Sequence, residues 1–328
     1  KSITMTVVIT VVNIIVLLSN YFYCKKKLDV NIKFMGFDKK LFKTIFSYSF
    51  FIFLGVIVDK VNWSVDQFVL GAVSGTIAVS LYSVASQINT LFVNLSNAMS
   101  GVLLPKMSKM ISKKASDKEI TNEFIKVGRI QYLIIFLMAS GFTLFGKEFI
   151  MAWAGKDFVT SYYIAVILIL PLCVPLIQNL GISIMQAKNM HKFRSILLAL
   201  IAIANIFISI PLAKAYGGIG SAIGTSLSLI IGNIIILNIY YHKKVGINVI
   251  EFWKSIIKMT IPMIIPIAAI VILMHFVTLH GYVNLIVFGG IYTILYCLTC
   301  YFLVMNNYEK NMINKVLIKL HLKSKESL

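Results

Sequence analysis

The side chains of this sequence that could do chemistry are a few polar and charged residues inside otherwise apolar stretches. Asp59 and Lys60 are adjacent within one such stretch, residues 41–71. Neighbouring residues on a helix point about 100° apart, so these two cannot form an ideal ion pair with each other, and each needs another partner or a hydrated cavity. In a cavity, Lys60 would offer a cation to an anionic group of a ligand. An ion pair with a residue outside this sequence, or a side chain that extends to the membrane surface, would explain Lys60 equally well.

Further polar residues share helical faces in the same stretch and in the next one. Asp59, Asn62 and Asp66 are spaced i, i+3 and i+7, which places them on one stripe of a helix. In the following apolar stretch, Gln87 and Asn94 also share a face. Two neighbouring helices with such side chains are typical of one wall of a hydrated pathway. The candidate ligand-binding residues are therefore Lys60, Asp59, Asn62, Asp66, Tyr48, Gln87 and Asn94.

Two of these candidates have a structural alternative. Asp66 could be a solvated carboxylate at the outer rim of the membrane, where its charge costs little. Tyr48 could stack on a sugar ring, or it could be one of the aromatic side chains that are common at membrane interfaces. The two polar helices together are a stronger indication than any single residue.

No arrangement of residues in the sequence points to catalysis or to a metal site. All four cysteines lie in apolar stretches, and Cys297 and Cys300 are one helical turn apart. A metal or redox role for this pair would need polar access and further ligands, so we interpret both as packing residues. Nucleotide-binding and metalloprotease motifs do not occur in the sequence. We expect no enzyme activity, no metal and no cofactor.

Nine apolar stretches, each long enough to cross a bilayer, hold these residues. Of the 328 residues, 59% are hydrophobic and 13% are charged. A membrane-spanning helix needs about 20 mostly apolar residues, and helices are the default spanning structure because lipid offers no partners to unpaired backbone groups. The sequence therefore predicts an all-α polytopic membrane protein. The predicted spans are 3–24, 41–71, 77–104, 130–146, 161–186, 195–213, 219–241, 255–276 and 282–304.

The net charge of +19 is distributed unevenly between the connecting loops. When the loops are assigned to alternating sides, one side carries 26 of the 31 Lys and Arg residues and the other carries 4. An excess of Lys and Arg marks the cytoplasmic face. We therefore predict a multi-pass protein of the cell membrane with a cytoplasmic C-terminus. Its basicity follows from topology, so nucleic acid is not an expected partner, while anionic membrane lipids are.

The sequence predicts part of a larger transporter. It begins with Lys1 at the outer edge of a span and without a signal peptide, so we expect an N-terminally truncated chain. A polar, basic linker separates one helix from eight that follow closely. The predicted domains are 1–27, the last helix of the N-terminal half; 28–40, a cytoplasmic linker; 41–241, the six-helix core of the C-terminal half; 242–304, two additional helices; and 305–328, a basic cytoplasmic tail.

Glycines and one proline mark expected structural breaks. Pro105 is expected to close the third span. Gly217 and Gly218 belong to a turn that leads into a helix, and Gly220 and Gly224 lie four residues apart on that helix. Small residues at this spacing allow two helices to approach closely. We expect these positions to be structural.

Four motifs, in order and at matching spacing, resemble segments of a known family. They are DQFVLG at 66–71, VSLYSVASQI at 79–88 followed by LLPKMS at 103–108, IMQAKNMHKFR at 184–194 and AYGGIGSAIGT at 215–225. They look like the end of helix seven, helix eight, the basic turn between helices ten and eleven, and the Gly-rich turn into helix twelve. The chain thus resembles the Wzx-like polysaccharide flippases (O-antigen or capsule repeat-unit flippases) of the multidrug/oligosaccharidyl-lipid/polysaccharide exporter superfamily, which have a MATE-like fold.

The resemblance implies fourteen helices in two pseudo-symmetric halves, of which this chain would hold helix six and the complete second half. It also implies alternating access that moves an undecaprenyl-diphosphate-linked oligosaccharide from the inner to the outer leaflet, for synthesis of a surface polysaccharide. Helices seven and eight would line the cavity, with Lys60 as a contact of the diphosphate. The implied partners are this lipid-linked oligosaccharide, membrane lipids and a polysaccharide polymerase.

Two other functions remain as alternatives. A cation-coupled multidrug exporter of the same superfamily would need acidic residues for ion coupling and a mainly apolar pocket, whereas the Lys-bearing polar helix favours a sugar-lipid substrate. A membrane-embedded glycan polymerase would be expected to have a large charged loop outside the membrane. The predicted outside loops are short, and the longest lies near residues 147–160.

Overall fold

The computed structural model describes the backbone of residues 2–27, 38–101, 103–276 and 282–319, and the side chains of these residues apart from 2–5, 27, 47, 48, 51, 54–63, 191, 284 and 315–319. The chain divides into two compact units, Lys1–Ser49 and Phe50–Leu328. The first unit holds α1 (Ser2–Lys27) and the start of α2 (Lys39–Val73).

The described residues are helical apart from short connections, and no strand occurs among them. Among the shorter elements, η1 is a 3-10 turn, whereas η2, η3 and η4 are π-helical. The elements of the second unit after α2 are α3 (Gly75–Gly101), α4 (Leu104–Ser112), α5 (Asp117–Trp153), η1 (Lys156–Phe158), α6 (Val159–Ile177), α7 (Leu180–Ala187), α8 (His191–Leu229), η2 (Ile230–Ile236), α9 (Leu237–Tyr240), η3 (Tyr241–Val245), α10 (Val249–Phe276), α11 (Tyr282–Thr299), η4 (Cys300–Val304) and α12 (Asn307–Lys319).

The predicted class, an all-α polytopic membrane protein, is confirmed. Seven helical segments in the described part of the chain are long and apolar enough to cross a membrane. One of them, Lys192–Val245, contains two predicted spans, because the chain reverses at Gly217 (φ 57°, ψ −135°). The seven do not include α2, of which Ser64–Val73 counts as a shorter apolar helix. Each of the nine predicted spans therefore overlaps a helical segment, although two of them differ in their bounds.

Two expected boundaries differ from the structure. The prediction of one helix over 161–186 is wrong, because α6 ends at Ile177 and the separate helix α7 begins at Leu180. Pro105 does not close the third span, because α3 already ends at Gly101. Pro105 instead lies in the first turn of α4, where its missing N–H has no helical partner to lose.

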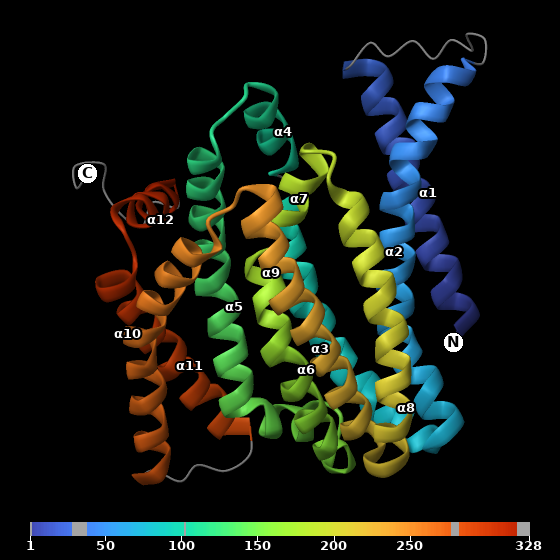
Figure 1. The fold of residues 1–328 in the computed structure, drawn as a ribbon. Coiled ribbons are helices and arrows are strands. Elements are labelled where there is room, and N and C mark those ends of the chain that lie inside the picture. Colours follow the sequence, from blue (N-terminus) through green and yellow to red (C-terminus); the bar gives the residue numbers. More distant parts are fainter. Residues whose placement is uncertain (1, 28–37, 102, 277–281, 320–328) are drawn as a thin grey trace. The chain divides into compact units, whose positions relative to one another are not determined.

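The described connections of the second unit that were predicted to be cytoplasmic lie at one end of that unit (Figure 1). That end carries α4, the turn after α7, the turn between η3 and α10, and α12, and it is the upper end in the figure. The α5 helix starts there with a capping box, in which Ser116 accepts from the Glu119 N–H and the Glu119 carboxylate accepts from the Ser116 N–H. The Ser116 N–H and the Ser116 hydroxyl both donate to the Glu119 carboxylate, and these two hydrogen bonds hold the pKa of that carboxyl below its usual range.

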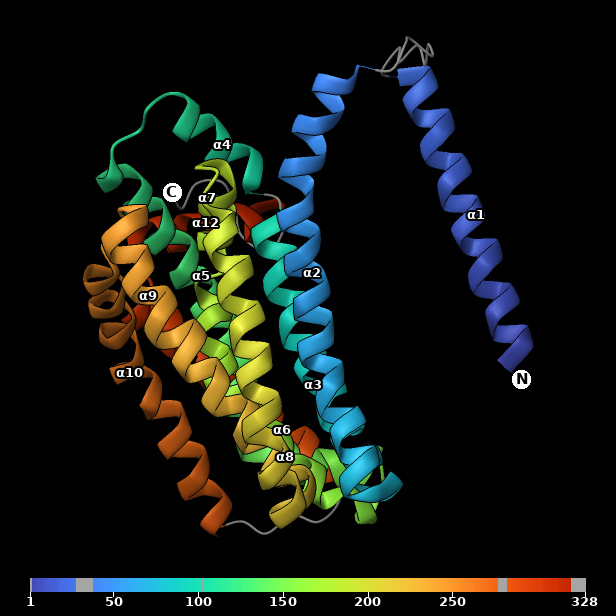
Figure 2. The same ribbon diagram turned by 45° about the vertical axis from the view of Figure 1, so that its right-hand side comes forward.

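The reversal at Gly217 turns α8 into two antiparallel arms, which Figure 2 shows side by side. We call residues 191–216 the first arm and residues 218–245 the second arm. A Cβ on Gly224 would lie 3.0 Å from the Cα of Ser209, and a Cβ on Gly220 would collide with the backbone carbonyl of Leu212. The two glycines therefore let the arms approach more closely than any residue with a side chain could.

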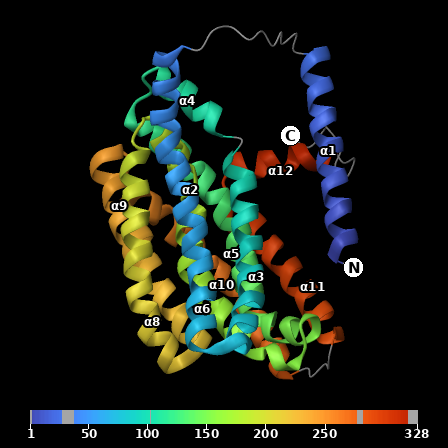
Figure 3. The same ribbon diagram turned by 90° about the vertical axis from the view of Figure 1, so that its right-hand side faces the viewer.

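The helices of the second unit pack around α6 and α5. The α6 helix contacts α3, α5 and α8, while α10 and α11 contact each other and α5 (Figure 3). Along α5, the Tyr132 hydroxyl lies 2.6 Å from Thr260 Oγ1, and Ser140 Oγ lies 2.5 Å from the Tyr292 hydroxyl. Polar contacts as well as apolar packing thus hold the last two long helices to the bundle.

Candidate functional site

The four candidates on the first part of α2 lie outside the described side chains. The backbone of α2 is helical over Tyr48, Asp59, Lys60 and Asn62, but the directions of these side chains are not described. Their assignment to a cavity therefore stays a prediction.

Asp66 is fully buried between α2, α3 and the second arm of α8. Its side chain is 0% exposed. The carboxylate accepts hydrogen bonds from the Tyr82 hydroxyl at 2.6 Å, from Ser221 Oγ at 2.9 Å and from Thr225 Oγ1 at 2.7 Å. The alternative of a solvated carboxylate at the membrane rim is therefore wrong, because neighbouring helices supply the hydrogen bonds that water would supply at a surface.

A second layer of polar side chains from the first arm of α8 surrounds these donors. Asn205 Nδ2 donates to Thr225 Oγ1 at 3.2 Å, and Ser209 Oγ donates to Asn205 Oδ1 at 2.8 Å. Sequence reasoning missed these residues. The available signal was the four-residue spacing within each arm, with Asn205 and Ser209 on one and Ser221 and Thr225 on the other, inside otherwise apolar helices.

We call Asp66 and the polar side chains around it the Asp66 cluster; they are Tyr82, Asn205, Ser209, Ser221 and Thr225. This cluster can hold a positive charge. Among the described residues, none forms an ion pair with Asp66. Hydroxyl hydrogens rotate, so Tyr82, Ser221 and Thr225 can turn either a hydrogen or a lone pair toward the carboxylate. The cluster can therefore stabilise an anionic Asp66 by hydrogen bonds, hold it protonated, or present oxygen ligands of the kind that small hard cations prefer. Within the described part of the chain, no group of three or more His, Cys, Asp and Glu residues could hold a metal ion.

Gln87 and Asn94 lie on a different face of α3 from Tyr82. Both side chains are exposed, and neither makes a hydrogen bond to any described residue. Seven residues apart, they lie almost above one another along the helix. The structure thus brings these two candidates together as expected, but it does not add Asp66 to them, because Asp66 contacts the opposite, buried face of α3.

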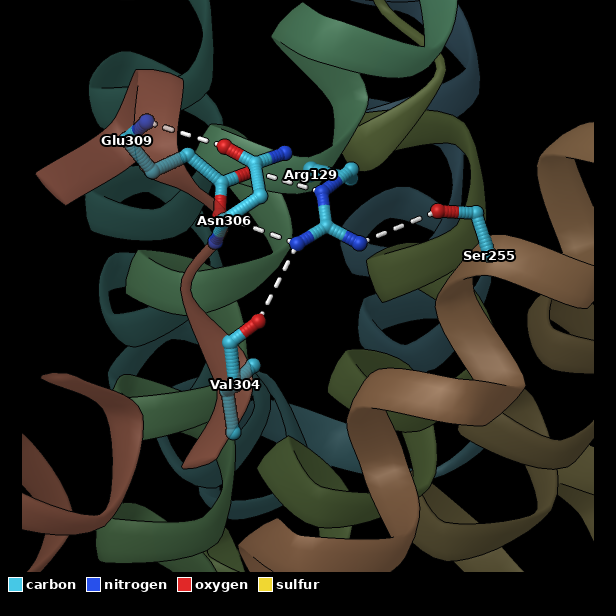
Figure 4. A network of polar contacts seen from close by, with 5 residues as sticks. All are labelled: Arg129, Ser255, Val304, Asn306 and Glu309. Atoms are coloured by element: carbon cyan, nitrogen blue, oxygen red, sulfur yellow. Dashed lines mark hydrogen bonds and ion pairs between the residues drawn. The ribbon is translucent and has the colours of Figure 1, made fainter. Parts of the chain in front are cut away.

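A second buried charge lies near the end of the bundle that carries the basic connections. Arg129 of α5 makes a two-pronged ion pair with Glu309 of α12, with Nε 2.6 Å from Oε1 and Nη2 2.9 Å from Oε2 (Figure 4). The same guanidinium donates to Ser255 Oγ at 3.1 Å and to the Val304 carbonyl at 3.2 Å. Asn306 caps α12 by accepting from the Glu309 N–H at 2.9 Å. We call this group the Arg129 clamp; the sequence analysis did not anticipate it.

Comparisons with known proteins agree with this fold. Residues 2–111 match the model of a family described as polysaccharide biosynthesis protein. Among solved structures, the chain is similar to a lipid II flippase, MurJ, in its inward closed conformation, with a TM-score of 0.60 and 18% sequence identity. This match covers 91% of the present chain and 59% of that chain, so the present chain spans less than two thirds of that flippase. No curated protein matches.

The structural match shows that the chain has a MurJ-like polytopic helical fold. The family model, whose description concerns polysaccharide biosynthesis, agrees with the resemblance to Wzx-like polysaccharide flippases found in the sequence. The segment that matches the family model includes Asp66, Gln87 and Asn94.

Proposed function

We propose that this chain is the C-terminal part of a flippase that moves a lipid-diphosphate-linked oligosaccharide from the inner to the outer leaflet by alternating access. The exposed polar face of α3 carries this proposal, because free amide groups on a helix of membrane-spanning length need water or a polar ligand beside them. The description of the matching family and the name of the similar structure support it.

The transport of a sugar diphosphate across a membrane needs a hydrated polar surface such as this face of α3. A sugar diphosphate is charged and strongly hydrated and cannot cross hydrocarbon unaided, whereas a polyprenyl tail can stay in lipid. A hydrated groove that is open to the bilayer would carry the polar head while the tail remains in the membrane. Repeated halves that move around a site near the membrane midplane are the general transporter solution, so we expect the rest of the protein to complete the cavity.

The remaining parts of the proposal concern orientation and partners. The gathering of Lys-rich connections at one end of the second unit favours a cytoplasmic C-terminus. A lipid-linked repeat unit delivered to the outer leaflet needs an enzyme that joins such units, so a polysaccharide polymerase is the partner we propose. The assignment of Lys60 to the diphosphate rests on its cation alone.

A cation-coupled exporter of small molecules is the second candidate, and the Asp66 cluster favours it. A buried carboxylate without an ion pair to a described residue is a suitable place for a coupling proton or cation. Coupling of this kind would serve either substrate, so it does not separate the two functions. The uncharged polar face of α3 does separate them, because it suits hydroxyl-bearing sugars better than an apolar cation.

Translocation by the full-length protein in proteoliposomes tests this function. We expect a lipid-diphosphate-linked oligosaccharide to reach the opposite leaflet faster than in empty vesicles. Lys60→Ala should slow translocation if Lys60 contacts the diphosphate. Lys109→Ala, which changes an exposed lysine of α4, is the matched control and should have no effect. Translocation at the background rate, together with ion-driven efflux of a cationic dye, would instead identify a multidrug exporter.

A further inference from the structure

The rotation of α3 about its own axis is fixed by hydrogen bonds toward both ends. Toward its start, Tyr82 donates to Asp66 at 2.6 Å. Toward its end, Ser96 Oγ donates to the Leu176 carbonyl at 2.8 Å, and Ser100 Oγ accepts from Gln131 at 2.6 Å. Tyr82, Ser96 and Ser100 are all buried on one side of the helix. The opposite side therefore faces away from the packed bundle.

That opposite side is polar along much of its length. Ser80, Gln87 and Asn94 follow one another at seven-residue intervals and are all exposed, with Thr90 exposed beside them. The distance from Ser80 to Asn94 along the helix axis is roughly 21 Å at 1.5 Å per residue. Ile77 and Leu91, which are 78% and 57% exposed, are large apolar residues on the same side. We call Ser80, Gln87, Thr90 and Asn94 the α3 amide face.

The chemistry of the α3 amide face is neutral. The helix, Gly75–Gly101, contains no Asp, Glu, Lys, Arg or His. The two amides make no hydrogen bond to any described residue, and each offers two N–H donors and one oxygen acceptor. Sugar hydroxyls both donate and accept hydrogen bonds, so they match amides and hydroxyls, whereas a diphosphate or a carboxylate would need cationic partners.

We propose that the α3 amide face binds the uncharged, hydroxyl-bearing sugar portion of the transported lipid. This inference rests on the proposed function and assigns the diphosphate and the glycan to different parts of the cavity. The diphosphate binds cationic groups elsewhere, and α3 contributes to the selection of the glycan. Gln87 and Asn94 are the principal contacts because their amides make no hydrogen bond to a described residue. The hydroxyls of Thr90 and Ser80 donate to the backbone carbonyls of Ser86 and Thr76 in their own helix. Their oxygen atoms therefore serve as acceptors for the sugar hydroxyls.

Binding measurements with two lipids test this division. The purified full-length protein is titrated in nanodiscs with undecaprenyl-diphosphate-linked oligosaccharide and, separately, with undecaprenyl diphosphate. The double variant Gln87→Leu/Asn94→Leu should raise the Kd of the oligosaccharide lipid by about tenfold, as expected for the loss of two amide contacts. The Kd of undecaprenyl diphosphate should stay within about twofold. Asn122→Leu is the matched control, because Asn122 is an exposed asparagine near the start of α5, outside the predicted span 130–146.

Three results would overturn the proposal. Equal weakening for both lipids would mean that the face binds the diphosphate or supports the fold. No change for either lipid would mean that a helix of the rest of the protein covers this face. A wild-type protein that binds neither lipid would reject the proposed function itself. The conservative variant Asn94→Gln guards against misfolding, because it keeps the amide and should retain most of the binding that Asn94→Leu loses.

Discussion

Two sites in the second unit, the Arg129–Glu309 pair and Asp66, stabilise a buried carboxylate in different ways. Arg129 meets Glu309 in a two-pronged ion pair, and Ser255 and the Val304 carbonyl take further hydrogen bonds of the guanidinium. Asp66 is buried as completely as Glu309, at 0% and 2% exposure, but its described partners are neutral hydroxyls. The first site contains a positive and a negative charge, whereas the described residues of the Asp66 cluster contain only the negative charge of the carboxylate.

The Arg129 clamp is a fixed contact, whereas the charge of the Asp66 cluster can change. A paired and fully hydrogen-bonded charge needs nothing further, so the Arg129 clamp holds α5, α10 and α12 together in one arrangement. A lone buried carboxylate is costly unless a proton or a cation neutralises it. The energy of the Asp66 cluster therefore depends on whether a proton or a cation neutralises the carboxylate.

The first prediction addresses the variable site. Asp66→Asn should reduce transport by the full-length protein at least tenfold, because the neutral amide cannot take up a coupling proton and holds a cation without the charge of a carboxylate. Its effect on stability should be small, about 1–2 kcal/mol, since charge-assisted hydrogen bonds are lost but no charge stays buried. Translocation in proteoliposomes and thermal unfolding in detergent measure the two quantities. Tyr82→Phe, which keeps the carboxylate, should retain transport; equal loss in both variants would make the cluster purely structural.

The second prediction addresses the fixed site. Arg129→Ala should destabilise the protein by about 3–5 kcal/mol, because Glu309 would remain buried without its partner. The double variant Arg129→Met/Glu309→Leu removes both charges and should be much closer to the wild type. Denaturation midpoints of the three proteins provide the comparison. If the single and double variants were equally unstable, lost packing would account for the effect.

The third prediction tests how the two arms of α8 assemble the Asp66 cluster. Gly224→Ala should cost about 1–3 kcal/mol, because its Cβ would lie 3.0 Å from the Ser209 Cα. Separation of the arms should also lower transport, since it moves Asn205 away from Thr225. Gly289→Ala is the control, because a Cβ there meets nothing within 4 Å. It should leave both the melting temperature and transport unchanged or slightly improved.

The smallest effect is expected at a polar pair on the surface. Ser116→Ala should lower stability by about 1 kcal/mol through loss of the α5 cap. The Ser116 hydroxyl also donates to the Glu119 carboxylate and helps to lower its pKa, so this part of the stabilisation is complete above the usual Glu range and is lost as the pH falls through the lowered value. The difference in melting temperature between wild type and variant should therefore become smaller in acid. A difference that stays constant at all pH values would assign the effect to the hydrogen bond that Ser116 Oγ accepts from the Glu119 N–H.

The sequence predicted the fold class well because lipid makes helix length and hydropathy decisive. It placed Gln87 and Asn94 on one face, since that follows from helical spacing alone. It missed the partners of Asp66 and Arg129 because they are far along the chain: Ser221 is 155 residues from Asp66, and Glu309 is 180 residues from Arg129. Periodicity describes one helix at a time and contains no information about which helix becomes its neighbour.

The separation of Arg129 from Glu309 has a consequence for biosynthesis. A ribosome adds roughly 5–20 residues per second, so about 10–40 s pass between synthesis of the arginine and synthesis of its carboxylate. Throughout that interval α5 carries a cation, near the end of the bundle that holds the basic connections, whose permanent counter-charge has not yet been synthesised. Solvent or an anionic headgroup must accompany it until α12 emerges. The ion pair that joins α5 to α12 can therefore form only after the chain has been made as far as Glu309.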